Sequence, residues 1–269
     1  MSIPLCCGME RSGSTMTWQI IKSIIPRSRP LGWEPGCEVD RWTGHPIDWP
    51  IKRHHYFSGE RPVIYTYRNP IEAFLSCRRV FGSDAGQSIQ TECEDQFDAD
   101  RMALEKIVAH RHIYQTYCED QAKGRPVLFL KYEDFYYSSE ARVQAISQFL
   151  KVDPPLTDYE ISILCDYTRI EKNIERAGRL KSFNDDRDPN TGMQANHVDL
   201  LSRGAPGSLL ARHPGFVHAV NNEKYNLGPL KELCSLMEYE IPETFEQPQE
   251  LNKIKNTINH PTLSWPTLK

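Results

Sequence analysis

The amino-acid sequence predicts one α/β domain, in which a central parallel sheet carries helices on both faces. Three observations predict this fold class. Short apolar segments typical of buried strands alternate with longer segments whose apolar residues recur at helical spacing. The first expected strand leads through a glycine-bracketed loop into a helix, as in phosphate-binding loops. No repeat and no linker divides the 269 residues, so residues 1–269 are expected to form a single domain.

Two expected strands, each followed by a helix, lie in the first 80 residues. In order they are strand Ser2–Cys7, helix Thr15–Ile25, strand Pro62–Tyr67 and a helix from Asn69-Pro70 to about Val80. Pro26 ends the first helix, because proline cannot continue the helical hydrogen-bond ladder. Residues 26–60 are rich in Pro, Gly, Trp and His and show no sustained period, so they are expected to be irregular.

The remaining elements complete the alternation. In order they are helix Glu94–Gln121, strand Val127–Lys131, and helices Ala141–Leu150, Asp158–Tyr167 and Leu230–Tyr239. Arg176–Gly207 is rich in Gly, Asn, Asp and Pro, which predicts a long loop or lid. Residues 241–269 are polar and proline-bearing, which is typical of a peripheral tail.

Composition excludes several classes of function. The net charge of −4 provides no global field that would attract nucleic acid or a membrane surface. The apolar runs fall far short of the roughly 20 residues of a membrane span, and no charged leader precedes the first strand. The eight cysteines lack CxxC spacing, so we expect reduced thiols in a cytoplasmic protein and no metal site.

The segment GMERSGST, residues 8–15, matches the pattern G-x-x-x-x-G-K-[ST] except that Ser14 replaces the lysine. Such a loop still offers backbone N–H groups and a helix N-terminus to a phosphate, and its hydroxyls add donors. The nearest cation is Arg11, whose planar fork fits phosphate-like oxygens. No acidic strand end is placed to hold Mg²⁺. A glycine-rich turn without a ligand is the alternative.

A second candidate anion site follows the strand that ends at Tyr67. Arg68 at the carboxyl end of a strand would point toward the ligand crevice of an open α/β sheet. Ser76 lies about two helical turns further on and could bind the same phosphate. The alternative is an ordinary salt bridge at the start of a helix.

Five segments together resemble the sulfotransferases that use 3′-phosphoadenosine 5′-phosphosulfate (PAPS). In chain order they are Arg11-Ser12-Gly13-Ser14-Thr15, Arg68-Asn69-Pro70-Ile71-Glu72 with Ser76, Tyr132-Glu133-Asp134, Tyr167-Thr168-Arg169-Ile170, and Ser202–Gly207. The resemblance implies the P-loop-like fold of that family and sulfuryl transfer that leaves adenosine 3′,5′-bisphosphate (PAP). It also accounts for the absent lysine, because PAPS has no γ-phosphate and the family needs no Mg²⁺.

The resemblance also implies a role for each segment. The 5′-phosphosulfate would be bound by Arg11, Ser12, Gly13, Ser14, Thr15 and Met16. The 3′-phosphate would be bound by Arg68, Ser76, Ser202, Arg203 and Gly204. The adenine would lie near Tyr132, Thr168 and Ile170.

The base that deprotonates the acceptor has several candidates. Lys52-Arg53-His54 resembles the K-[ST]-H motif of cytosolic sulfotransferases, which implies that His54 is the general base and Lys52 binds donor oxygens. Its neighbour His55 is an alternative. The loop RSGST also resembles that of the tyrosylprotein and carbohydrate sulfotransferases, whose base is a glutamate that follows the loop. Glu34 and Glu38 lie near the distance from the loop at which that branch has its glutamate.

The acceptor is expected to be a small molecule with a hydroxyl group. Aromatic residues crowd the irregular segment and either form the wall of a pocket for an apolar or aromatic acceptor or pack the loop onto the core; they are Trp33, Trp42, Trp49, Tyr56 and Phe57. A P-loop kinase is a rival activity that the missing lysine disfavours. A non-catalytic nucleotide-binding relative is another, and a homodimer stays open.

Overall fold

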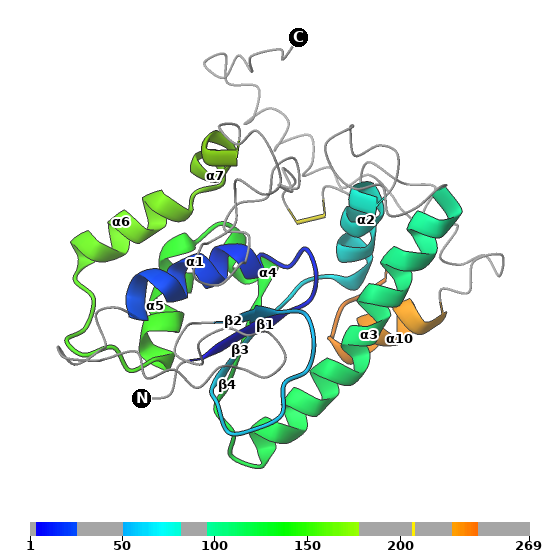
Figure 1. Ribbon diagram of the computed structural model, residues 1–269, viewed down its shortest axis with the longest axis horizontal. Coiled ribbons are helices and arrows are strands. Elements are labelled where there is room, and N and C mark those ends of the chain that lie inside the picture. The colour runs from blue at the N-terminus through cyan, green and yellow to red at the C-terminus, as the bar shows by residue number, and fades with distance from the viewer. Residues whose placement is uncertain (1–3, 26–50, 82–95, 178–205, 208–227, 242–269) are drawn as a thin grey trace, which may run out of the picture.

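A computed structural model of the chain describes residues 4–25, 51–81, 96–177, 206–207 and 228–241. Within these residues, four strands form one sheet, in the order β2-β1-β3-β4 (Figure 1). Their bounds are β1 Leu5–Gly8, β2 Ile51–Arg53, β3 Val63–Tyr67 and β4 Val127–Lys131. Every neighbouring pair is parallel, with Leu5 opposite both Ile51 and Val63.

Helices cover both faces of this sheet, on opposite sides of the strands in Figure 1. One layer contains α1 (Ser14–Ile24), α5 (Ser139–Phe149) and α6 (Asp158–Thr168). The other contains α2 (Pro70–Phe81), α3 (Gln96–Ala122) and α10 (Gly228–Leu236). The short helices are α4 (Tyr132–Tyr136) and α7 (Ile170–Ala177). The structure thus confirms the predicted α/β class with a central parallel sheet.

The sheet is buried on both faces because its side chains alternate between two apolar clusters. Cys6 and Ile64 pack among the residues of α1, α5 and α6. Cys7 and Tyr65, one position further along each strand, pack among those of α2, α3 and α10. A parallel sheet covered by helices on both sides requires this pattern. All six cysteines of the described residues are free thiols.

Three elements differ from the sequence expectation. Strand β2 lies in the segment expected to be irregular, and its three residues pair with β1. Helices α4 and α7 were not expected, and α7 occupies the start of the predicted loop. A three-residue strand is too short to show a period, and its stability comes from pairing with a distant segment. The rest of that loop, except Pro206 and Gly207, and the tail from residue 242 lie outside the described residues.

Candidate active site

The carboxyl ends of the four strands lie at one edge of the sheet, because all the strands are parallel. Each strand leads directly into a predicted site segment: β1 into the loop after Gly8, β2 into His54, β3 into Arg68 and β4 into Tyr132. Ligands of open α/β sheets bind outside this edge. The candidate site is therefore built by the chain direction of the strands.

The loop between β1 and α1 is held closely against β3. A Cβ atom added to Gly8 would lie 2.0 Å from Thr66 Oγ1 and 2.9 Å from Thr66 O, so no larger residue fits here. Ser12 Oγ lies 2.6 Å from Met9 O and 2.7 Å from Thr66 Oγ1. The Ser12 hydroxyl, which was expected to bind donor oxygens, thus stabilises the loop itself.

Helix α1 presents an uncapped N-terminus to this loop. Its N-cap residue is Gly13 with a φ of 81°, which has no side chain to form a capping hydrogen bond. Its first turn contains no acidic residue. The first N–H groups of a helix have no partners within the helix and carry the positive end of its dipole. An anion bound at this end would supply the missing cap.

Two arginines converge beside the loop. Arg11, whose φ is 63°, donates from Nε to Ser76 Oγ at 2.9 Å. The fully buried Arg68 donates to Glu72 Oε2 at 2.7 Å and to Arg11 O at 3.2 Å, and its guanidinium lies 4.5 Å from the centre of the Tyr132 ring. Arg68 Nε is buried and has no hydrogen-bond partner in the part of the chain that the structure describes. The two predicted phosphate-binding segments therefore form one continuous polar cluster.

Strand β2 brings Lys52 and His54 to the same loop. Lys52 Nζ donates to Thr15 Oγ1 at 2.5 Å. His54 Nδ1 lies 2.6 Å from the carbonyl oxygen of Gly8. Because a carbonyl oxygen only accepts hydrogen bonds, Nδ1 carries the hydrogen and Nε2 keeps its lone pair. Burial lowers the pKa of His54 to about 4, against the opposing charge of Glu10, so the ring is neutral at pH 7.

Two residues beside His54 were not singled out from the sequence. Glu10 accepts a hydrogen bond from His110 Nε2 at 2.7 Å, and His110 Nδ1 lies 2.9 Å from the Tyr65 hydroxyl. Burial opposes ionisation of Glu10, but the hydrogen bond from His110, together with the positive charge that His54 carries in acid, outweighs burial and lowers the pKa of the carboxyl. Glu10 and His110 are far apart in the chain, so no local pattern could reveal the pair.

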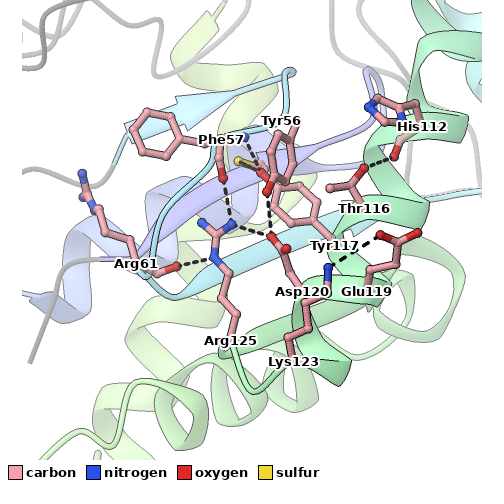
Figure 2. A network of polar contacts seen from close by, with 11 residues as sticks. Tyr56, Phe57, Arg61, His112, Thr116, Tyr117, Glu119, Asp120, Lys123 and Arg125 are labelled. Carbon is pink, nitrogen blue, oxygen red and sulfur yellow. Dashed lines mark hydrogen bonds and ion pairs between the residues drawn. The ribbon is translucent and has the colours of Figure 1, made fainter.

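The segment after β2 is fastened to the end of α3, as Figure 2 shows. Tyr56 donates to Asp120 Oδ2 at 2.9 Å, and the Phe57 N–H donates to the Tyr117 hydroxyl at 3.1 Å. Arg125 donates to both Phe57 O and Asp120 Oδ2 at 2.8 Å. These contacts fix the backbone that follows the histidine. The side chains of Tyr56 and Phe57, two candidates for an acceptor pocket, pack against the apolar cluster beneath α2, α3 and α10, which favours packing onto the core.

The segment around Thr168 lies beside α1. Thr168 Oγ1 donates to Leu164 O at 2.8 Å, and Asn173 Nδ2 donates to Thr168 O at 3.0 Å. Asn173 Oδ1 in turn accepts a hydrogen bond from Gln19 Nε2 at 3.2 Å. Ile170 begins α7. The segment expected near the adenine is thus tied to α1, the helix that follows the predicted phosphate-binding loop.

Other predicted residues cannot be placed at this site. His55 is exposed, whereas its neighbour contacts the loop. Several candidates lie outside the described residues: Glu34, Glu38, Trp33, Trp42, Trp49, Ser202, Arg203 and Gly204. Among the described residues, no three His, Cys, Asp or Glu side chains gather closely enough to hold a metal ion. None of the described helices has both the length and the apolar character to cross a membrane.

Comparison with solved structures shows what this architecture is similar to. Mouse sulfotransferase SULT7A1 complexed with PAP superimposes with a TM-score of 0.50 at 15% identity, over 87% of this chain and 88% of that one. Retinol dehydratase in a complex with retinol and PAP gives 0.52 at 14% identity, over 91% of this chain and 83% of that one. The chain has the sulfotransferase fold.

Comparison by sequence gives no corresponding match. No family model matches the chain, and no curated protein does. At 14–15% identity, the structural likeness establishes the fold and leaves the chemistry to be argued from this chain's own residues.

Proposed function

We propose that this protein is a PAPS-dependent sulfotransferase that transfers the sulfuryl group to a hydroxyl of a small-molecule acceptor and releases PAP. The observation that carries the proposal is that a neutral histidine, a lysine and two arginines lie around the loop that leads from β1 into the N-terminus of α1. Two proteins of the same fold were solved with PAP bound, which supports the identity of the nucleotide.

The donor site would use two groups of residues. The N-terminus of α1, Arg11 and Lys52 would bind the 5′-phosphosulfate, and Arg68 with Ser76 would bind the 3′-phosphate. The buried Nε of Arg68, without a partner among the described residues, fits this role, because an acceptor on a ligand would satisfy it. Ser202, Arg203 and Gly204 would complete the 3′-phosphate site, and Tyr132, Thr168 and Ile170 would surround the adenine.

PAPS supplies an activated sulfuryl group whose leaving group is a phosphate. His54 Nε2 would accept the proton of the acceptor hydroxyl as its oxygen bonds to sulfur and the bond from sulfur to the phosphate oxygen breaks. Its Nδ1 hydrogen bond to Gly8 holds the ring in the tautomer that this step needs. Arg11 and Lys52 would stabilise the charge that develops on the leaving phosphate.

The acceptor is expected to be apolar or aromatic and small. Retinol dehydratase, one protein of this fold, was solved with retinol, an apolar alcohol. We also infer that the protein works without a metal ion, because cations of its own side chains surround the donor loop.

The test is incubation of the purified chain with ³⁵S-labelled PAPS, with and without EDTA, against phenols, steroid alcohols and retinoid alcohols. We expect transfer of label to at least one acceptor, release of PAP in equal amount, and no effect of EDTA. Transfer of phosphate from ATP with Mg²⁺ instead would establish the rival kinase. Binding of PAP with no transfer to any acceptor would favour a nucleotide-binding protein.

A further inference from the structure

Arg142 on α5 is a buried cation that pairs with no Asp or Glu among the described residues. The residue is 3% exposed, and its guanidinium lies 5.9 Å from the centre of the Phe135 ring, which carries no charge. The other buried arginine of the described residues differs, because Arg68 pairs with Glu72 at 2.7 Å. A buried charge without a partner is costly, so proteins retain one where a ligand or partner compensates it.

The guanidinium of Arg142 lies beside the first turn of α1. Its NH1 group is 2.6 Å from Met16 Sδ, and a Cβ atom on Gly13 would lie 3.7 Å from it. A thioether is a weak acceptor and carries no charge. Burial lowers the pKa of Arg142 to about 10, with Tyr132 opposing this, so the group stays protonated at neutral pH.

Arg142 and Arg11 approach the loop from different sides. Arg11 contacts Ser76 of α2, and α2 and α5 cover opposite faces of the sheet (Figure 1). An anion at the N-terminus of α1 would therefore lie between two guanidinium groups. The uncapped helix end and the uncompensated cation are separate observations, both made on the described residues, that point to the same ligand chemistry.

We propose that Arg142 binds an anion seated at the N-terminus of α1, which in the proposed reaction is the 5′-phosphosulfate of the donor. This inference rests on the proposed function for the identity of the donor, but not for the anion itself. The residue lies outside all the segments that resemble sulfotransferases.

The test compares three ligands by calorimetry and thermal unfolding of the full chain: PAP, adenosine 3′-monophosphate and inorganic pyrophosphate. Arg142→Gln should lower the affinity for PAP and for pyrophosphate by at least about 30-fold, the loss typical of removing one partner from a desolvated charge pair. It should change the affinity for adenosine 3′-monophosphate, which lacks the 5′ anion, by less than about threefold. Without ligand, the variant should melt no lower than the wild type, because an unpaired buried charge has been removed.

Two further variants keep the test decisive. Arg111→Gln removes an arginine from an exposed ion pair with Glu232 and should leave all three affinities unchanged. Arg142→Lys keeps the charge but loses the planar guanidinium. It should lower the affinity for PAP by about tenfold, and it keeps the test available if the Gln variant does not fold.

The outcomes separate the two proposals. If the Arg142 variants lower the affinity for all three ligands equally, or lower it for none of them, the proposed role of Arg142 is wrong. Binding of pyrophosphate but not of PAP to the wild type, with the same dependence on Arg142, would support this anion site and refute the proposed function. Failure of the wild type to bind either would refute both.

Discussion

At the scale of single residues, the proposed chemistry depends on which histidine lies against the loop between β1 and α1. His54 and His55 are neighbours, but only His54 contacts Gly8, and His55 is exposed. The hydrogen bond at Nδ1 leaves Nε2 as the basic atom, and the low pKa keeps it unprotonated at neutral pH. A base that is already neutral can accept a proton without first losing one.

His54→Ala should lower turnover by about 10²- to 10⁴-fold, the usual contribution of a general base. PAP affinity should change little, because a base contacts the acceptor and not the nucleotide. Steady-state kinetics and calorimetry measure the two quantities, with His55→Ala as the matched control. If His54→Ala stays within a few-fold of the wild type while Glu34→Gln or Glu38→Gln is inactive, the base is the glutamate of the rival branch.

The shifted pKa of His54 also makes stability depend on pH. An unfolded chain protonates this histidine from about pH 6.5, whereas the folded protein keeps it neutral down to about pH 4. Between these values the unfolded state binds more protons, so the free energy of unfolding falls as the pH falls. In His54→Gln, the free energy of unfolding should therefore depend less on pH in this range, as measured by urea denaturation.

His55→Gln provides the comparison for that slope. It should leave the pH dependence between about pH 4 and 6.5 as in the wild type, because the residue is exposed. If the free energy of unfolding depends on pH equally in the wild type and in His54→Gln, the folded protein does not keep His54 neutral in this range.

At the scale of elements, the site depends on how closely β1 approaches β3. Gly8 ends β1, and its missing side chain lets the loop turn directly over Thr66. The hydroxyls of Ser12 and Thr66 then hold the loop in place at 2.7 Å. The position of Arg11, three residues beyond Gly8, follows from this contact.

Gly8→Ala should destabilise the protein by about 1–3 kcal/mol or more, because the new methyl group overlaps Thr66 and the strands must shift. Gly8→Ala/Thr66→Ala should recover only part of the loss, since the backbone oxygen of Thr66 is also too close, at 2.9 Å. Urea denaturation measures both variants, with Thr66→Ala alone as the reference that the double variant needs. Full recovery in the double variant would show that only the side chain of Thr66 matters.

The sequence predicts those elements whose signals are local. The glycine spacing of residues 8–13 and the Asn-Pro that opens α2 mark the loop and the helix start, and Asn69 Oδ1 does accept the Ile71 N–H at 2.9 Å. Strand β2 has no such signal, because three residues show no period and the pairing with β1 is distant in the chain.

The same reasoning explains which site residues were missed. The sequence alone identifies three residues as candidates because they belong to short motifs: Arg11, Arg68 and His54. The contact between Glu10 and His110, and the burial of Arg142, arise only when α3 and α5 pack onto the sheet. Neither leaves a pattern along the chain.

At the scale of the whole molecule, parallel strands gather the site at one edge of the sheet. Residues from the ends of all four strands lie around the loop between β1 and α1. Under the proposed function, the arrangement would account for the departure from the Walker pattern, because Arg11, Lys52 and Arg68 would supply the cations that a lysine in the loop otherwise provides. The central claim is that these cations recognise two separate anions on one nucleotide.

Calorimetric titration without Mg²⁺ tests that claim most directly, by comparing PAP with adenosine 5′-monophosphate, which lacks the 3′-phosphate. PAP should bind and raise the melting temperature, as does any ligand selective for the folded state. The monophosphate should bind about 10²-fold more weakly, because Arg68 and Ser76 would lose their ligand. Equal affinity for the two nucleotides, or a requirement of PAP binding for Mg²⁺, would contradict the claim.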